Sequence, residues 1–296
     1  MGISGKPGQE TIDEGASEGN TTMDQSMDQL LTHTDGMGQD NMFSKAWYNE
    51  YFTRAYESPT HGRFCEAVYG RDLCQHGMMD VEEMEFLASL LKPDEQVLEI
   101  GCSNGRITEY LAQASGSSIL GVDYSDVAIA QARRRTLSKA DRLAFQCVDL
   151  VADDIPGERY DTIVAVDCIY FMGDYGTTIS KLHAKLKPRG RMIVSAIQAK
   201  EEGDAEDVLQ PRRTRLAQIL TTLSLTYQPY DFTANVRNHW IKNYDYSRSL
   251  HADFAAEGNA FLADARIAEN GWFKDHAEGG TLVRFIYVID SNSKKS

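Results

Sequence analysis

Short apolar segments alternate with segments of helical period between residues 81 and 200. Met84, Leu87 and Leu91 show the helical spacing in the first of them, and Pro93 ends it. Strands alternating with amphipathic helices predict a parallel sheet covered on both faces, which is an α/β fold. The predicted strands lie at 97–100, 119–123, 143–148, 162–166 and 192–197.

The sequence predicts three regions. Residues 1–40 are rich in Gly, Ser, Thr, Asp and Gln, and predict a disordered tail because they hold few large apolar side chains. Residues 41–80 are unusually aromatic and predict a lid of one or two helices. The remainder, 81–296, is the predicted core. Its later parts are a helix at 205–222, a strand at 225–232, and a last strand at 281–289. A helical cap at 234–278 is inserted before that last strand.

Charge and composition exclude several classes of function. The net charge is −14 and no basic stripe is present, so we expect no binding to nucleic acid. No apolar run reaches about 18 residues, so we expect no membrane span. The five cysteines form no C-x-x-C pair and the seven histidines show no metal-ligand spacing, so a reduced, cytoplasmic protein without a metal is predicted.

A glycine-containing turn follows the first predicted strand and opens a helix. It reads Glu99-Ile100-Gly101-Cys102-Ser103-Asn104-Gly105. Glycines at such a turn let the backbone bend tightly and approach a ligand closely. The strand-to-helix context makes this turn more informative than an isolated glycine motif.

Carboxylates also end the next three predicted strands, at Asp123, Asp149 and Asp167. Ligands of open α/β sheets bind beyond the carboxyl ends of the strands, so these side chains are candidate ligand contacts. Asp123 at the second strand can accept hydrogen bonds from a ribose diol, which is also the logic of dinucleotide sites. The glycine spacing does not fit the Gly-x-Gly-x-x-Gly of dehydrogenases.

Together these landmarks resemble the class I S-adenosylmethionine-dependent methyltransferases over roughly residues 80–200. Gly101 and Gly105 match the outer glycines of that family's first motif, whereas Ser103 replaces the middle one. The resemblance implies a Rossmann-like, seven-stranded, mostly parallel sheet with helices on both faces, and S-adenosylmethionine as cofactor. The turn before the fifth strand, at 186–192, also matches the family and is architectural.

The resemblance also implies roles for individual residues. Glu99 would lie near the methionine amino group, Asp123 would bind the ribose hydroxyls, and Asp149 would receive the adenine amino group. The backbone of Leu150 would meet the adenine ring. The full set of implied cofactor contacts is Glu99, Gly101, Cys102, Ser103, Gly105, Asp123, Tyr124, Asp149, Leu150 and Asp167.

Candidate acceptor-side residues come from the aromatic regions and the fourth strand end. Tyr170 and His76 are the candidate catalytic residues, since the ordinary pKa of a histidine suits a base near neutral pH. Packing of Tyr170 on the next helix and a structural role for His76 are the alternatives. The candidate substrate contacts are Tyr56, His61, Tyr69, Tyr170, Trp240 and Tyr244, with lid packing as the alternative for Trp240 and Tyr244.

The function predicted is methyl transfer to a small-molecule metabolite, with a nitrogen acceptor slightly favoured. A carbon or oxygen acceptor, and a cyclase or decarboxylase that reuses the same site, are the alternatives. A non-catalytic binding role is disfavoured because Glu99, Gly101, Asp123 and Asp149 are all present. A homodimer is compatible with the sequence.

Overall fold

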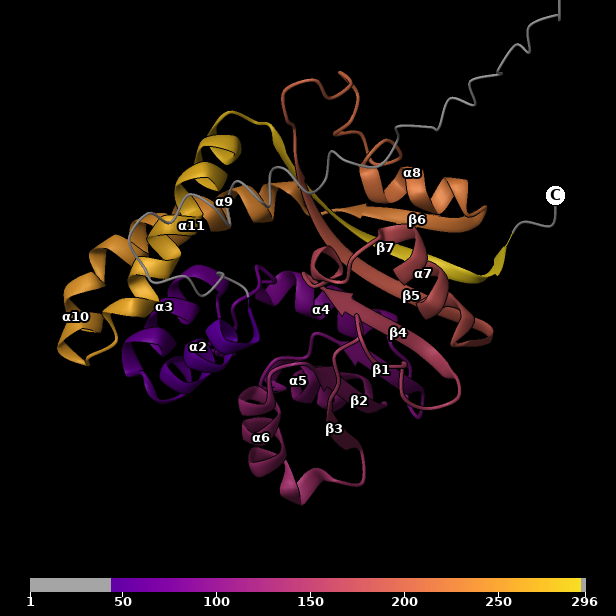
Figure 1. Ribbon diagram of the computed structural model, residues 1–296, viewed down its shortest axis with the longest axis horizontal. Coiled ribbons are helices and arrows are strands. Elements are labelled where there is room, and N and C mark those ends of the chain that lie inside the picture. The colour runs from indigo at the N-terminus through magenta and orange to yellow at the C-terminus, as the bar shows by residue number, and fades with distance from the viewer. Residues whose placement is uncertain (1–43, 294–296) are drawn as a thin grey trace, which may run out of the picture. The chain divides into compact units, whose positions relative to one another are not determined.

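The computed structural model describes the backbone of residues 44–293, which form a helix-covered seven-stranded sheet (Figure 1). The predicted disordered tail, 1–40, lies outside the described residues. The strand order is β3-β2-β1-β4-β5-β7-β6. Within this sheet β7 runs in the opposite direction to the other six strands. The strands are β1 Gln96–Ile100, β2 Ser118–Asp123, β3 Leu143–Cys147, β4 Tyr160–Val166, β5 Leu186–Ala199, β6 Leu225–Asp231 and β7 Leu282–Ser293. The predicted fold class is confirmed.

Helices connect and cover the strands, and three of the described helices precede the sheet in the chain. Those preceding or joining the first five strands are α2 Lys45–Glu57, α3 Pro59–Tyr69, α4 Val81–Leu90, α5 Arg106–Ser115, α6 Asp126–Arg135, η1 Leu137–Lys139, η2 Ile169–Phe171 and α7 Tyr175–Ala184. The later ones are α8 Arg215–Thr222, α9 Thr233–Ser249, α10 His251–Ala256 and α11 Ala260–Glu278.

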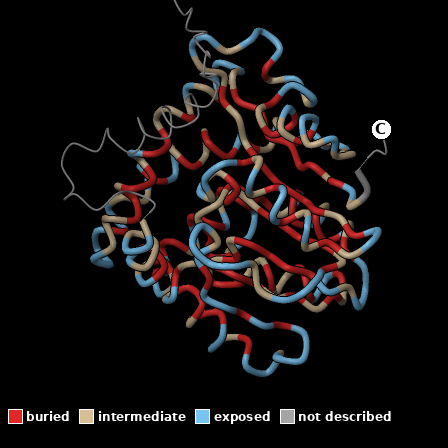
Figure 2. Tube along the Cα trace, turned by 45° about the vertical axis from the view of Figure 1, so that its right-hand side comes forward, coloured by how far each residue is buried: buried red, intermediate tan, exposed pale blue. Residues whose placement is uncertain are grey.

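The sheet has a buried apolar cluster on each face, as the buried strands in Figure 2 show. Alternation along β1 separates the two clusters: Leu98 packs with α7 and α8, whereas Val97 packs with α4, α5 and α6. This is the two-sided burial expected of a parallel sheet. The helices on both faces therefore hold the strand ends at fixed positions.

Local signals in the sequence begin several helices. Asp80 and Glu83 form a capping box at the start of α4, in which each side chain accepts a hydrogen bond from the other residue's backbone N–H. Ser125 caps α6 by accepting the N–H of Ala128. These caps satisfy backbone donors that the first helical turn leaves unpaired.

Two predicted boundaries are wrong. The helix predicted over 205–222 is confined to α8, because residues 201–213 form turns and Thr214 caps the helix by accepting the N–H of Ala217. The fifth strand begins at Leu186, before the predicted 192, since Leu186 pairs with Tyr160 and a register shift absorbs the intervening residues. In that segment Arg189 adopts a left-handed φ of 67°.

The aromatic segment forms two helices, and these pack with the C-terminal helices. α2 contacts α6 and α11, and α3 contacts α9 and α10. Glu257, which follows α10, accepts hydrogen bonds from Ser58 Oγ at 2.5 Å and from the Thr60 backbone at 3.0 Å. Segments about 200 residues apart in the chain thus form one cap, here called the helical cap (α2, α3, α9, α10 and α11). Among the described residues, no helix is both long and apolar enough to cross a bilayer.

Candidate functional site

The candidate site lies where the direction of strand order reverses. β1 has β2 on one side and β4 on the other, so the chain runs from β1 to β2 and β3 on one side and then crosses to β4 on the other. In open α/β sheets a ligand crevice forms at such a switch point. The residues that end β1, β2, β3 and β4 are therefore the candidate ligand contacts.

The turn after β1 needs glycine at both of its ends. Gly101 has a φ of +69°, and a Cβ placed there would lie 2.6 Å from the Cβ of Cys168. Gly105 has a φ of +71° where α5 begins, and its Cβ would overlap the ring of Phe145. Inside the turn, Cys102 donates its N–H to Val122 O at 3.0 Å. The turn therefore packs tightly against β2, β3 and the end of β4.

Glu99 presents a buried carboxylate at the end of β1. It is 2% exposed, and its Oε2 atom has no hydrogen-bond partner within the described residues. Burial raises its pKa to about 7, and the negative charge of Asp123 adds to the rise. A buried carboxylate oxygen without a donor is costly, so this atom is a natural partner for a ligand N–H group.

Asp123 ties the ends of β1 and β2 together. Its Oδ2 accepts the N–H of Ser103 at 2.9 Å and its Oδ1 accepts the N–H of Ser125 at 2.8 Å. Burial raises the pKa of this carboxyl, and the backbone hydrogen bonds oppose the rise. Each oxygen of a carboxylate can accept a second hydrogen bond, so Asp123 can receive two ligand hydroxyls while keeping its backbone contacts.

The other predicted cofactor contacts lie along the same edge. Asp149 is exposed just past β3, where its Oδ1 accepts the N–H of Val151 at 3.0 Å. Leu150 and Tyr124 are half-buried, and the Tyr124 ring lies 5.8 Å from that of Tyr48 in an edge-on contact. The structure thus brings these residues to the strand ends predicted for them, while their ligand roles stay predictions.

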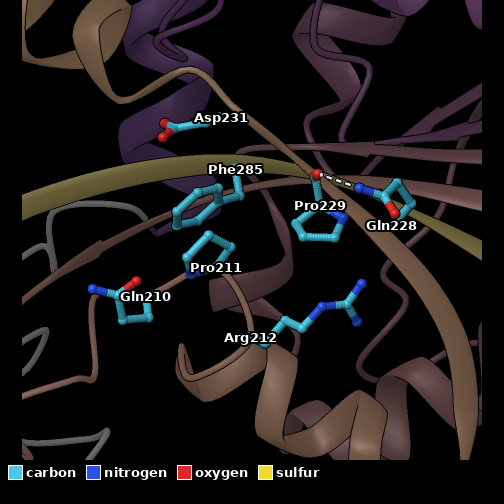
Figure 3. A pocket seen from close by; sticks show the side chains of 7 residues that line it. All are labelled: Gln210, Pro211, Arg212, Gln228, Pro229, Asp231 and Phe285. Carbon is cyan, nitrogen blue, oxygen red and sulfur yellow. Dashed lines mark hydrogen bonds between the residues drawn. The ribbon is translucent and has the colours of Figure 1, made fainter.

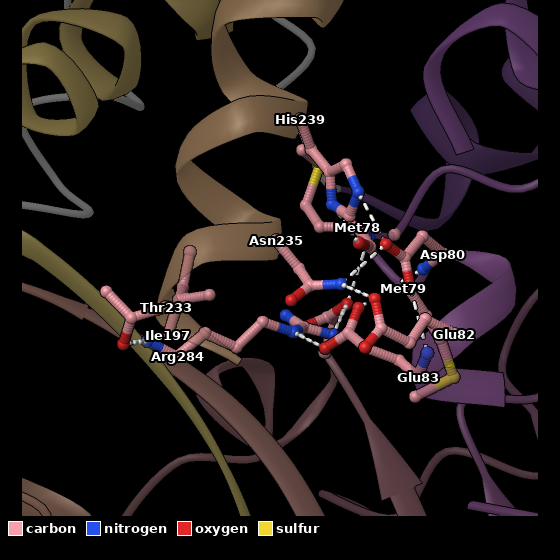
Figure 4. A network of polar contacts seen from close by, with 12 residues as sticks. Met78, Met79, Asp80, Glu82, Glu83, Ile197, Thr233, Asn235, His239 and Arg284 are labelled. Carbon is pink, nitrogen blue, oxygen red and sulfur yellow. Dashed lines mark hydrogen bonds and ion pairs between the residues drawn. The ribbon is translucent and has the colours of Figure 1, made fainter. Parts of the chain in front are cut away.

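Asp167 follows β4 and pairs with Arg284, which belongs to a charged network with Glu83; Figure 4 shows Arg284 and Glu83. The Asp167 oxygens lie 2.5 and 3.0 Å from Arg284 Nη1 and Nη2, and Oδ2 also accepts the N–H of Met78 at 2.9 Å. Asp167 adopts a left-handed φ of 50°. Its side chain therefore anchors the 73–79 loop to the sheet, and cofactor contact by it stays a prediction.

Arg284 lies at the centre of that network, which sequence reasoning missed. It is fully buried on β7 and also pairs with Glu83. Burial raises the pKa of Glu83 to about 7, although the charge of Arg284 opposes the rise. Buried charges without partners are strongly destabilising, so the three side chains depend on one another. A lone arginine in an apolar strand was the only signal for it in the sequence.

A possible metal-ligand set adjoins Arg284. Ligand atoms of Asp80, Glu83 and His239 lie within 4.8 Å of one another. His239 Nε2 pairs with Asp80 Oδ2 at 2.9 Å, and Asn235 donates to the same oxygen at 2.9 Å. The Arg284 guanidinium already supplies a positive charge beside Glu83, so the cluster is accounted for by protein contacts.

His76 lies inside an aromatic cluster formed by α2. Its ring centroid is 5.3, 5.4 and 4.9 Å from those of Trp47, Tyr48 and Tyr51, each contact being edge-on. Its Nε2 is 3.7 Å from Glu269 Oε2. Burial lowers the pKa of His76 well below its ordinary value, and the charge of Arg266 lowers it further. His76 is therefore neutral near pH 7.

Tyr170, His61 and Tyr69 are all engaged by other protein groups. The Tyr170 hydroxyl accepts the backbone N–H of Ile197, and burial raises the pKa of Tyr170 well above its ordinary value. His61 is buried and desolvation lowers its pKa to about 3. The Tyr69 hydroxyl accepts Asn243 Nδ2 at 3.0 Å. Roles in substrate binding or catalysis for these residues stay predictions.

The remaining predicted substrate contacts spread over the helical cap. Trp240 is 1% exposed and stacks on Phe273 with ring centroids 4.1 Å apart. Tyr244 is half-buried and hydrogen-bonds Arg248 at 3.1 Å, while the guanidinium of Arg106 lies 5.6 Å from the Tyr56 ring. These contacts match the packing alternative for Trp240 and Tyr244 more closely than a shared wall beside His76.

A separate open hollow lies beside the edge strand β6 (Figure 3). Arg212 and Asp231 are the only ionisable groups of its lining, and none of the predicted site residues is among them. Pro229 in the edge strand limits pairing of a further strand there. The lining residues are Gln210, Pro211, Arg212, Gln228, Pro229, Asp231 and Phe285.

Comparison with known proteins bears directly on the strand-end site. Residues 98–192 match the model of a family described as a methyltransferase domain. A ubiquinone biosynthesis O-methyltransferase of Bradyrhizobium diazoefficiens is 31% identical over 130 residues, which are 44% of this chain and 49% of that protein. Phosphoethanolamine N-methyltransferase 1 of Zea mays is 28% identical over 131 residues, 44% of this chain and 26% of that protein. The chain thus spans half or less of these curated relatives.

Residues 98–192 are a methyltransferase domain. The strand order places this domain in the class I, Rossmann-like type, whose methyl donor is S-adenosylmethionine. A structure of Haemonchus contortus phosphoethanolamine N-methyltransferase 2, solved with phosphomonomethylethanolamine and S-adenosylhomocysteine, shares this fold. It matches with a TM-score of 0.62 at 15% identity, over 82% of this chain and 59% of that one. The methyltransferase domain contains Glu99, Asp123, Asp149 and Asp167, whereas His76 and Glu269 lie outside it.

Proposed function

We propose that the protein is an S-adenosylmethionine-dependent methyltransferase that acts on a small-molecule acceptor. The observation that carries this proposal is the pair of buried carboxylates, Glu99 and Asp123, at the ends of neighbouring parallel strands. The methyltransferase domain over 98–192 supports it, because both residues lie within the matched segment.

The hydrogen-bond acceptors at this edge of the sheet fit the proposed cofactor. No group of residues 44–293 donates a hydrogen bond to the buried Glu99 Oε2, so this atom can accept one from an amino group. Asp123 retains acceptor capacity on both oxygens after its two backbone hydrogen bonds, as a ribose diol would require. Gly101 and Gly105 let the turn between the two strands adopt its left-handed conformations and pack closely against Cys168 and Phe145.

Methyl transfer from a sulfonium needs alignment more than acid or base strength. S-adenosylmethionine supplies an activated methyl group when it is bound. The protein then has to hold the acceptor in line and exclude water. The helical cap covers the acceptor side, and its rings around His76 provide a dry wall. A base is needed only for an acceptor that arrives protonated, and His76 and the neighbouring Glu269 are both placed to serve then.

A nitrogen acceptor is the form of the proposal that we favour. Aromatic faces attract cations, and Trp47, Tyr48 and Tyr51 surround the position of His76. The similar proteins include both an O-methyltransferase and an N-methyltransferase, so they support methyl transfer without choosing the atom. A carbon or oxygen acceptor, or a non-methylating reaction at the same site, is the second candidate.

Asp123→Ala tests the proposal at the donor site. We expect the affinity for S-adenosylhomocysteine to fall at least about 100-fold in titration calorimetry, because two hydrogen bonds to a charged group are lost at roughly 1.5–3 kcal/mol each. Asp141→Ala, an exposed carboxylate near β3, is the matched control and should bind like the parent protein. Unchanged affinity in Asp123→Ala, with the fold intact by circular dichroism, contradicts the ribose role.

A further inference from the structure

Arg266 and Glu269 form a buried charge pair on α11 that the donor site does not use. Both face the helical cap interior, with 3% and 8% of their surfaces exposed. Arg266 Nη1 and Glu269 Oε2 lie 3.6 Å apart, which is too long for a hydrogen bond. Neither residue was singled out from the sequence, where the i, i+3 spacing on a helix is the only signal.

Both partners have hydrogen-bonding capacity that the protein leaves unused. Arg266 Nη2 donates hydrogen bonds to Tyr51 Oη at 3.0 Å and to Gln75 O at 3.2 Å. Its Nε and Nη1 atoms have no hydrogen-bond partner among the described residues. Within the described residues, Glu269 makes ion pairs at 3.6 Å to Arg266 and 3.7 Å to His76, and its side chain accepts no hydrogen bond. Buried groups of this kind are normally satisfied by a water or a ligand.

The pair lies next to the proposed reaction centre. His76, which Glu269 approaches, is two residues from Met78, and the Met78 N–H is held by Asp167 at the end of β4. On the other side, Tyr48 spans from the His76 ring to the Tyr124 ring beside Asp123. The contacts of His76 and Tyr48 therefore connect the surroundings of Glu269 with the donor-binding strand ends.

Charge balance decides which kind of molecule suits this place. The pair itself is neutral, so a ligand that is only a cation or only an anion would add an uncompensated charge to a buried site. A ligand with both charges close together completes a ring of four alternating charges. Its amine meets Glu269, and its anionic group meets the free N–H groups of Arg266.

We propose that Arg266 and Glu269 bind an acceptor whose amine and anionic group are separated by only one or two carbons, as in an α-amino acid or phosphoethanolamine. This inference rests on the proposed function and specifies its substrate class. Glu269 takes one proton from the ammonium and frees the nitrogen lone pair. That pair forms the N–C bond as the S–C bond breaks, and the electrons of the broken bond stay on sulfur. The products are the N-methylammonium and S-adenosylhomocysteine, and Glu269 then returns its proton to water.

Calorimetry on the full chain, saturated with S-adenosylhomocysteine, tests the proposal with four probes. Glycine and phosphoethanolamine carry both charges, whereas glycine methyl ester lacks the anion and acetate lacks the amine. We expect one zwitterion to bind at least about tenfold more tightly than either single-charge probe, which corresponds to about one charged hydrogen bond. Preference between glycine and phosphoethanolamine distinguishes a carboxylate from a phosphate.

Glu269→Gln keeps the shape of the side chain and removes its charge. We expect it to weaken binding of the preferred zwitterion at least about tenfold and to leave S-adenosylhomocysteine affinity unchanged. Glu278→Gln, at the exposed end of the same helix, is the matched control and should change neither. If Glu269→Gln does not fold, the four-probe comparison on the parent protein decides alone.

Three outcomes overturn the inference, and they are separable from failure of the proposed function. They are binding of S-adenosylhomocysteine without binding of either zwitterion, equal binding of single-charge probes, and full zwitterion affinity in Glu269→Gln. A parent protein that binds no S-adenosylhomocysteine refutes the proposed function instead.

Discussion

The two sides of the candidate site are built in different ways. On the donor side, Glu99, Gly101, Gly105 and Asp123 lie within 25 residues of one another and are held by hydrogen-bonded parallel strands. On the acceptor side, His76 meets Glu269 across almost 200 residues of chain. The donor side is therefore a property of one βαβ unit, whereas the acceptor side exists only when the helical cap has closed on the sheet.

This difference teaches where variation is tolerated. Strand ends in a sheet are fixed by backbone pairing, so the carboxylates at those ends keep their spacing whatever the outer helices do. The cap rests on side-chain contacts between α2, α3 and α9 to α11, of which the Glu257 hydrogen bonds are examples. Changes in the cap should alter acceptor recognition before they alter the donor site.

Arg284→Met is the strongest way to break the comparison, because Arg284 links the two sides. It leaves Glu83 and Asp167 as buried carboxylates without their cation. We expect the free energy of unfolding to fall by about 3–5 kcal/mol in urea denaturation. The same change at the exposed Arg134 should have almost no effect.

A second change refines that prediction. Adding Glu83→Gln to Arg284→Met removes one of the two orphaned carboxylates, so part of the lost stability should return. If Arg284→Met is as stable as the parent protein, the charged network does not hold the 73–79 loop to the sheet.

Glu99→Gln tests the donor side through the pH dependence of the free energy of unfolding. Burial raises the folded-state pKa of Glu99 from 4.5 to about 7, so its contribution to stability is complete below about pH 4.5 and is lost as pH rises through 7. Glutamine does not ionise. We therefore expect Glu99→Gln to gain up to about 3 kcal/mol over the parent between pH 5 and pH 8.

Ligand binding should change in the opposite sense in that variant. At pH 8 the affinity for S-adenosylhomocysteine should fall, because the charge proposed to meet the amino group is missing. Thermal denaturation at both pH values, with calorimetry at pH 8, measures the two effects. Equal pH dependence in the variant and the parent contradicts a raised pKa for Glu99.

Glu257→Gln is the mildest test and addresses the cap alone. The exposed carboxylate loses charge-assisted hydrogen bonds to Ser58 and Thr60, which are worth at most about 1 kcal/mol at an exposed site. We expect faster hydrogen exchange in α2 and α3, with exchange in β1 and β2 unchanged. Faster exchange in the strands as well would mean that the cap and the sheet open together.

Local patterns predicted the sheet far better than the cap. The apolar segments at 97–100 and 119–123 were correctly identified as strands because burial on both faces leaves a continuous apolar run. The helix over 205–222 was wrong in its first half, since residues 201–213 turn to place Glu201 and Asp204 against Arg215. Such ion pairs leave no periodic trace in the sequence.

The acceptor side shows the same limit at the level of single residues. His76 was a candidate from its type and its neighbours, but nothing in the order of residues indicated Glu269 as its partner. Trp240 was a candidate substrate contact with lid packing as the alternative, and the structure stacks it on Phe273. An aromatic residue at helical spacing serves either purpose, and only its neighbours decide which.

The sequence by itself determined the α/β architecture, the glycine turn and the order of carboxylates at the strand ends, because strand pairing and backbone sterics act over a few residues. Only the tertiary structure decided that Asp167 binds Arg284 and that Glu269, which lies beside Arg266, approaches His76. The burial and pairing of charged side chains depend on which distant segments of the chain come into contact. The local sequence pattern does not show which residues will be in contact.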